Sequence, residues 1–274
     1  MNKFNTVTFQ KKLRNLGLEE GSTVYVTGNL GKIGFPYSLS GTKIKSKIQI
    51  LEFYLNTILE IIGVNGTIIF PTHSFDLIKN QEIFDPNETP TNYTFSEYLR
   101  IKLKSRRQVH PYASIASYGK YAKKIIPDHI TKHAYGLDSP YTFFENNECL
   151  FISLGLPLRR SISAVHYCEF KVGVPYRYTK SFKQILRLNG KESLEEFFLY
   201  VWYDDVQIVR DGNKKIFSIE NIRRNTKKEL IGNSFAESIP INIFIRETIQ
   251  AMLIDPYIWT KEIKGNNGYI PWEK

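Results

Sequence analysis

The stretch Cys149-Leu-Phe-Ile-Ser-Leu-Gly155 and the segment Ser161-Ile-Ser-Ala-Val-His-Tyr-Cys-Glu169 that follows it decide the fold prediction. The apolar run ending in glycine predicts a buried strand, and the second segment predicts a helix. On that helix the Ser163 hydroxyl, the His166 imidazole and the Glu169 carboxylate share one face, because they are spaced three residues apart. Junctions from strand to helix are where α/β proteins place their chemistry, so we expect a functional site here.

Strands and helices alternate on the N-terminal side of this junction. The apolar spacing predicts strands at 23–26, 66–71, 113–117 and 150–154, and helices at 7–16, 44–62, 95–103 and 118–126. Such alternation is typical of an α/β fold, and we expect a three-layer α/β/α sandwich around a mixed sheet.

On the C-terminal side the pattern changes. Residues 174–215 are rich in tyrosine and alternate in polarity, which predicts a smaller antiparallel cap or insertion that closes over a ligand. Helices are expected again at 219–228 and 241–253, followed by a loose tail at 264–268. With no repeat or linker in the chain, we expect one domain over residues 1–274, with the cap inside it.

The composition limits the class of protein. The 274 residues carry 37 Lys and Arg against 27 Asp and Glu, a net charge of +10 that favours anionic ligands. No nucleic-acid motif accompanies this charge, and phosphorylated small molecules explain it equally well. A secretory apolar segment and a run long enough to span a bilayer are both missing, so we expect a cytoplasmic protein without membrane insertion. Cys149 and Cys168 have neither disulfide-framework nor zinc-site spacing.

Two further segments contain groups that suit phosphate binding. Thr27-Gly-Asn-Leu-Gly-Lys-Ile-Gly34 follows the first strand, and its glycines allow either a phosphate cradle, with Lys32 as a cation, or an ordinary turn. Ser105-Arg-Arg-Gln-Val-His-Pro-Tyr-Ala-Ser114 combines guanidinium, imidazole and hydroxyl groups. Its arginines suit bidentate phosphate contacts, but a solvated basic helix end with His110 capping a turn is an equal alternative.

Asp76 lies just beyond the strand at 66–71, where side chains point into clefts. A helix-cap or turn role is the commoner use of such an aspartate. An alternative interpretation is that a metal ion is bound by His73, Asp76, His166 and Glu169. The His-x-x-Glu pair lacks the HExxH arrangement, so we expect no metal.

Taken together and in order, these segments resemble the aminoglycoside 3-N-acetyltransferase family, over about residues 5–175. The motifs that carry the resemblance are Gly21-Ser-Thr-Val24, Gly66-Thr67, Pro71-Thr-His-Ser-Phe-Asp76, Phe84-Asp-Pro-Asn-Glu-Thr-Pro90, Arg107-Gln-Val-His-Pro111 with Ser114, Gly136-Leu-Asp-Ser-Pro140 and Ser163-Ala-Val-His-Tyr-Cys-Glu169. Where the family usually has His-Ser-Ser after the first strand, this chain has Thr27-Gly-Asn29.

The resemblance implies acyl transfer from acyl-coenzyme A to an amine, by direct attack and without a metal. It implies that His166 is the general base, Glu169 its acidic partner and Asp76 a carboxylate near the acceptor amine. Ser163 stands where the family has threonine and keeps a hydroxyl that could stabilise an oxyanion. The coenzyme would be held by Asn29, Gly31, Lys32 and Gly34 of the glycine loop together with Arg107, His110 and Ser114.

The net charge bears on the acceptor. Aminoglycosides are polycations, whereas +10 favours an anionic acceptor, so we expect the amine of a nucleotide-linked amino sugar used in surface polysaccharide synthesis. An aminoglycoside 3-N-acetyltransferase that confers antibiotic resistance is the alternative. A non-catalytic polyanion-binding protein and a metal-dependent amidohydrolase are more remote. A homo-oligomer is compatible with the sequence, which does not identify the acyl chain.

Overall fold

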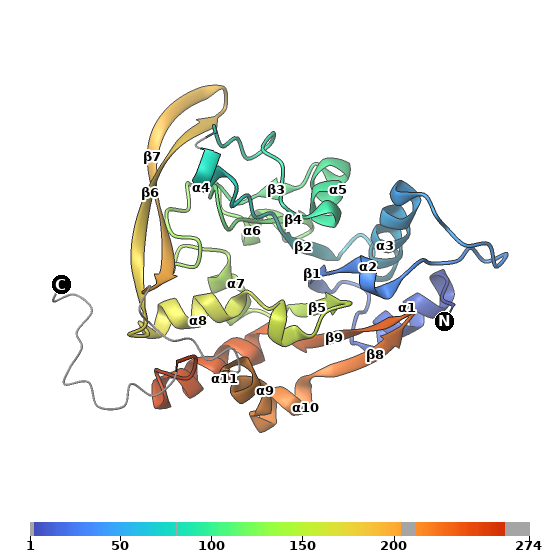
Figure 1. The fold of residues 1–274 in the computed structure, drawn as a ribbon. Coiled ribbons are helices and arrows are strands. Elements are labelled where there is room, and N and C mark those ends of the chain that lie inside the picture. The colour runs from blue at the N-terminus through green and yellow to red at the C-terminus, as the bar shows by residue number, and fades with distance from the viewer. Residues whose placement is uncertain (1–2, 81, 204–211, 261–274) are drawn as a thin grey trace.

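The computed structural model describes residues 3–80, 82–203 and 212–260 (Figure 1). Its main sheet has seven strands in the order β3-β4-β2-β1-β5-β9-β8. The central strand β1 is parallel to β2 and to β5, whereas the remaining pairs are antiparallel. The strands are β1 (Thr23–Gly28), β2 (Thr67–Pro71), β3 (Arg106–Arg107), β4 (Ile115–Gly119), β5 (Leu150–Leu154), β8 (Lys227–Ile231) and β9 (Ser234–Pro240).

Helices cover both faces of this sheet. Successive strand side chains point to opposite faces, and in β1 Val24 and Val26 join one buried cluster while Tyr25 joins the other. The first cluster is completed by α1 (Thr6–Asn15), α3 (Lys47–Ile62) and α5 (Thr94–Leu103). The second is completed by α7 (Tyr141–Asn146), α8 (Ala164–Val172), α9 (Gly212–Ser218), α10 (Glu220–Asn225) and α11 (Ile241–Ile254). The predicted α/β fold around a mixed sheet is confirmed.

The shorter helical turns lie in the connections between these elements. They are α2 (Leu30–Ile33), α4 (Leu77–Asn80), α6 (Ala122–Ile125) and the 3₁₀ turn η1 (Leu158–Arg160). Within the described ranges, no helix combines the length and the apolar character needed to cross a bilayer.

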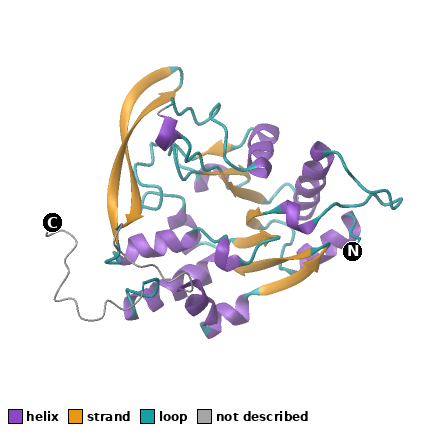
Figure 2. Ribbon diagram, viewed as in Figure 1, coloured by secondary structure: helices purple, strands orange, loops and turns teal. Residues whose placement is uncertain are grey.

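A long hairpin forms the second, two-stranded sheet (Figure 2). Strands β6 (Arg177–Leu188) and β7 (Lys191–Trp202) pair over their full length. The turn residues Asn189 and Gly190 both have positive φ, as a two-residue hairpin turn requires. Single bridges from Leu186 and Phe198 fasten the hairpin to loops of the main body.

Several predicted boundaries are wrong. The helix expected at 219–228 ends at Asn225, and residues 227–240 form the β8–β9 hairpin instead. The helix expected at 44–62 begins at Lys47. The helix expected at 118–126 is reduced to α6, because β4 continues to Gly119, where a φ of +119° and the backbone of Gly66 leave no room for a side chain. The 204–211 part of the predicted cap and the predicted tail lie outside the described residues.

Candidate active site

Helix α8 presents the predicted His166–Glu169 pair. Gly173 ends this helix in the left-handed conformation, and Tyr167 and Cys168 bury the opposite side. The His166 side chain is 38% exposed, whereas that of Glu169 is 1% exposed. The helix therefore holds a buried carboxylate beneath an accessible imidazole.

The two side chains are in direct contact. His166 Nδ1 lies 2.8 Å from Glu169 Oε2. A carboxylate only accepts hydrogen bonds, so Nδ1 carries the proton and the lone pair of a neutral imidazole is at Nε2. Tyr135 lies against the imidazole, with ring centroids 5.2 Å apart. This arrangement orients His166 to take a proton at Nε2.

Arg177 and Tyr176 complete this site, and the sequence analysis missed both. Arg177 Nη2 lies 2.9 Å from Glu169 Oε2, and the Tyr176 hydroxyl donates to Oε1 at 3.1 Å. Burial on its own would raise the pKa of Glu169, but hydrogen bonds and positive charge from His166 and Arg177 lower it below its usual value. Arg177 also lies over the Trp202 ring and donates to the Tyr200 carbonyl, so the base of the hairpin is tied to the Glu169 carboxylate.

A cavity of about 780 Å³ opens beside the N-terminal end of α8. Ser163, the residue before α8, lines it, and its hydroxyl is 2.7 Å from that of Tyr141. His73, which follows β2, lines the same cavity. The remaining lining residues are Tyr25, Val26, Thr27, Gly28, Asn29, Leu30, Gly31, Gly34, Phe35, Lys45, Lys47, Ile50, Leu51, Pro71, Asn92, Tyr93, Thr94, Phe95, Ser96, Leu156, Arg160 and Ser161.

The charge of this cavity is positive. Lys45, Lys47 and Arg160 line it, and among the described lining residues there is no Asp or Glu. Such a surface suits an anionic ligand. The sequence analysis did not single out these three cations, although Lys45 and Lys47 stand in the first turn of the helix predicted at 44–62, where a pair of lysines is a recognisable signal.

The glycine loop lies where the sequence predicted, but with a different local structure. Asn29, Gly31 and Gly34 line the cavity, whereas Lys32 does not. Residues 30–33 form the single turn α2 rather than an open cradle, and the Lys32 amide donates to the Asn29 carbonyl. The loop thus supplies one wall of the cavity, and its role in holding a ligand remains a prediction.

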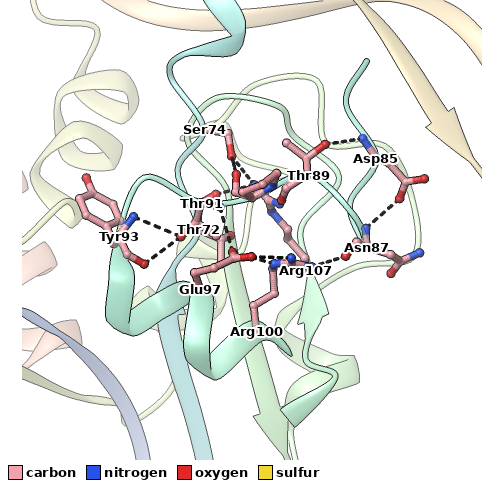
Figure 3. A network of polar contacts seen from close by, with 11 residues as sticks. Thr72, Ser74, Asp85, Asn87, Thr89, Thr91, Tyr93, Glu97, Arg100 and Arg107 are labelled. Carbon is pink, nitrogen blue, oxygen red and sulfur yellow. Dashed lines mark hydrogen bonds and ion pairs between the residues drawn. The ribbon is translucent and has the colours of Figure 1, made fainter. Parts of the chain in front are cut away.

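Arg107, His110 and Ser114 lie apart from the cavity lining. All three are buried. The Arg107 guanidinium donates to the Thr72 and Thr89 carbonyls, at 2.6 Å each, and to two hydroxyls, those of Ser74 and Ser114 (Figure 3). Four of the five guanidinium N–H donors are thus used within the protein, and the coenzyme role of Arg107 remains a prediction that these contacts do not favour.

His110 and Ser114 are also hydrogen-bonded within the protein. The Ser114 hydroxyl donates to the Thr72 carbonyl at 2.9 Å and accepts from Arg107 Nε at 3.0 Å. His110 Nδ1 accepts from the amides of Tyr112 and Ala113, and Nε2 lies 3.4 Å from the Phe198 carbonyl. Burial lowers the pKa of His110 to about 3. His110 therefore joins its own turn to strand β7, which fits the turn-capping alternative better than phosphate binding.

Asp76 is exposed and starts the turn α4. Its backbone carbonyl accepts from the amides of Lys79 and Asn80, and its carboxylate accepts from the Asn92 side chain. It does not line the cavity. A position near an acceptor amine stays a prediction. In the described part of the chain, no three His, Cys, Asp or Glu side chains gather as a metal site would require.

The site thus combines a hydrogen-bonded imidazole on α8 with a cation-lined cavity at the N-terminal end of the same helix, and this combination favours a group-transfer enzyme. His166 and Glu169 themselves are not among the residues that line the cavity. A family model described as aminoglycoside 3-N-acetyltransferase matches residues 42–250, so the chain belongs to this family. The protein is an acyl-coenzyme A-dependent N-acyltransferase.

Individual relatives agree with this membership. The aminoglycoside N(3')-acetyltransferase-like protein YokD of Bacillus subtilis (strain 168), derived from the SPbeta prophage, is 24% identical over 207 residues, which are 68% of this chain and 71% of YokD. The crystal structure of YokD superposes with a TM-score of 0.75 at 18% identity, covering 93% and 95% of the two chains. AAC-VIa bound to sisomicin gives 0.76 at 19% identity, covering 92% and 99%. AAC-IIIb with CoASH gives 0.73 at 16% identity, covering 92% and 97%.

Proposed function

We propose that the protein transfers an acyl group from acyl-coenzyme A to an amine of an amino sugar, with His166 as the general base. The observation that carries this proposal is the 2.8 Å contact between His166 Nδ1 and the buried Glu169, which leaves Nε2 to act as a base. An amine that attacks a thioester gains positive charge on its nitrogen and must lose a proton as the amide forms. Glu169 stabilises the imidazolium that forms when His166 takes this proton.

The bond changes balance without another reactant. The neutral amine nitrogen attacks the thioester carbonyl as Nε2 takes a proton from it. The carbonyl electrons move onto oxygen and return as the carbon–sulfur bond breaks. The imidazolium then protonates the departing thiolate, so the products are an amide and free coenzyme A. Ser163, at the cavity wall, is placed to donate to the developing oxyanion.

We place the donor in the 780 Å³ cavity. Coenzyme A carries several phosphate charges, and the cavity offers Lys45, Lys47 and Arg160 without a described carboxylate. The acceptor would approach His166 from the side of the β6–β7 hairpin, where Arg177 and Tyr135 already contact the site. In this arrangement the hairpin acts as the cap that the sequence predicted.

The comparisons favour an aminoglycoside-type acceptor over the nucleotide-linked amino sugar expected from the charge. The matching family is described by aminoglycoside acetylation, and the relative AAC-VIa binds sisomicin. The net charge of +10 and the aromatic-rich segment at 174–203, on which a base could stack, favour the nucleotide sugar, and the anionic donor accounts for part of this charge. We therefore propose a free polyamine sugar first and the nucleotide-linked sugar second.

The test is a thiol-release assay with acetyl-coenzyme A and two acceptor panels, aminoglycosides and amino-sugar nucleotides. We expect turnover with at least one aminoglycoside. Turnover confined to the nucleotide sugars, with kcat/KM falling as salt rises, would instead establish the second candidate. Coenzyme A binding without turnover of either panel would overturn the amino-sugar assignment, and a lack of coenzyme A binding would overturn the class of reaction at this site.

A further inference from the structure

His73 occupies a fixed position at the cavity wall. It follows β2, and its side chain is part of the cavity lining. The Thr72 amide donates to the Ser114 carbonyl at 2.8 Å, and the Asn92 amide donates to the His73 carbonyl at 2.8 Å. Only 8% of the residue is exposed. The backbone and burial together leave the imidazole little freedom to move.

The two ring nitrogens of His73 have different surroundings. Nδ1 lies 3.2 Å from the Tyr93 hydroxyl, and the Phe75 and Tyr93 rings meet the imidazole edge-on, with centroids 5.2 and 5.5 Å away. Nε2 is buried and has no hydrogen-bond partner among the described residues. Native proteins seldom leave a buried polar atom unpaired, so this nitrogen points to a ligand group.

The protonation state of His73 follows from these contacts. Burial first, and then the charges of His166 and Arg107, lower its pKa to about 3, so the ring is neutral near pH 7. A phenol is a better donor than acceptor, and burial raises the pKa of Tyr93, which keeps its hydroxyl protonated. Tyr93 therefore donates to Nδ1, and the single ring proton of His73 resides on Nε2. The unpaired atom is a hydrogen-bond donor.

We propose that His73 is a further catalytic residue, whose Nε2–H donates to the carbonyl oxygen of the acyl group in bound acyl-coenzyme A. This inference rests on the proposed function, which places the donor in the same cavity. Tyr25 and Ser163 line this cavity too. The hydrogen bond strengthens as the carbonyl electrons move onto oxygen during attack, and it weakens when they return and the carbon–sulfur bond breaks.

A neutral imidazole suits this role for a chemical reason. It polarises a carbonyl without carrying a net charge, so it neither repels the cationic His166 formed during attack nor competes with it for the amine proton. A charged group at this position would raise the energy of the imidazolium. The two histidines thus have different roles: His166 takes the amine proton, and His73 donates a hydrogen bond to the carbonyl oxygen.

The test compares two unreactive donor analogues by calorimetry. In acetyl-carba(dethia)-coenzyme A a methylene replaces sulfur and the carbonyl stays in place, whereas S-ethyl-coenzyme A has no carbonyl. We expect the wild-type protein to bind the ketone roughly three- to tenfold more tightly than the thioether. His73→Phe should lose most of this preference, with Ser163 left as a donor, and should lower kcat by roughly 10²-fold. His73→Gln keeps a donor near Nε2 and should recover part of kcat.

The possible outcomes distinguish a failure of the proposed His73 role from a failure of the proposed acyl transfer. If the wild-type protein binds coenzyme A and turns over but His73→Phe keeps both the preference for the ketone and kcat, the inference is wrong and the proposed function stands. If neither analogue binds the wild-type protein, the proposal that acyl-coenzyme A binds in this cavity is wrong, and the inference about His73 is wrong with it. Tyr93→Phe provides a check that does not alter His73. It should lower kcat several-fold, because the ring proton is then free to shift to Nδ1, and an unchanged kcat would overturn the assignment of Nε2 as the donor.

Discussion

Two polar residues on either side of the end of β2 contrast sharply in their contacts. Arg107 is buried, and its guanidinium donates to four protein oxygens. His73 is equally buried, but one of its nitrogens has no partner in the described structure, and it faces a cavity. By residue type alone, the arginine looked like the ligand-binding group and the histidine did not.

The contrast shows which property marks a functional group here. A buried polar side chain whose donors are mostly used within the protein has its desolvation cost offset there and fixes the local structure. A buried side chain with a donor left over keeps that capacity for a ligand. Residue chemistry suggests which groups are capable of binding, and the contacts decide which of them remain available.

The largest effect is expected from removing His166, the accessible imidazole, because the proposed function makes it the general base. His166→Ala should lower kcat by roughly 10²-fold or more, because the amine loses its proton acceptor, while coenzyme A affinity stays unchanged. His129→Ala is the matched control, since this histidine is exposed and far from α8 in the chain. Steady-state kinetics with calorimetry checks both, and near-normal turnover by His166→Ala at neutral pH would rule out the general-base role.

Arg107→Met tests whether the buried arginine stabilises the fold and does not bind coenzyme A. It should lower the free energy of unfolding by about 3 kcal/mol or more, because buried carbonyl and hydroxyl groups lose their donor. Coenzyme A affinity of the folded variant should not change. Urea denaturation and calorimetry measure the two quantities, with the more exposed Arg106→Met as a control that should lose less stability. A stable variant with weakened coenzyme A binding would restore the phosphate role that the sequence suggested.

The cations of the cavity should have a smaller effect. Lys45→Ala and Lys47→Ala should each raise the Kd of coenzyme A by roughly threefold at low salt, and less as salt screens the charges. Pantetheine, which lacks the nucleotide phosphates, should bind both variants as it binds the wild-type protein. Lys11→Ala removes the same charge from helix α1, outside the cavity. Equal effects of all three substitutions would mean that the overall charge, and not this cavity, attracts the coenzyme.

Acid should destabilise the protein through its buried histidines. Burial lowers the pKa values of His73 and His110 to about 3 and that of His133 to about 4. The unfolded chain binds these protons below about pH 6.5 and the native protein does not, so their stabilisation is complete above that pH and is lost as pH falls. Each histidine contributes a slope of up to about 1.4 kcal/mol per pH unit.

Urea titrations between pH 7.5 and 5 measure this slope, and the lower limit keeps most carboxylates ionised. His73→Phe should make the free energy of unfolding depend less steeply on pH, by up to about 1.4 kcal/mol per pH unit. The same slope in both proteins would mean that His73 is protonated in the native state, and its assignment as a neutral donor would then fail.

Much of the fold could be predicted because its central elements have clear periodicity. Strands β1, β2 and β5 are short apolar runs bounded by turn residues, and α3 and α11 have helical spacing over many residues. The β8–β9 hairpin was missed because Arg223 to Lys228 reads as a basic helical segment. The Gly232-Asn233 pair was the available turn signal, since it joins the two strands.

The site was only partly predictable for a related reason. His166 and Glu169 belong to one helix, so sequence spacing alone brought them together. Arg177 reaches Glu169 from a separate sheet, and His73 reaches the cavity through the end of β2, so neither contact has a signature within a short window of sequence. The coenzyme role expected for Arg107 stays a prediction, because no local sequence pattern shows that its guanidinium is hydrogen-bonded within the protein.

The β6–β7 hairpin separates two tasks along its own length. Arg177 and Trp202 are paired at one end, beside Glu169, whereas Leu188 and Lys191 are paired at the turn. With strands of 12 residues, the turn lies up to about 40 Å from Glu169. Changes of sequence or length near Asn189 can therefore alter the outer surface without disturbing the contacts among Arg177, Glu169 and His166. Evolution can vary the far end of this hairpin, and whatever that end contacts, while the site at its base is inherited intact.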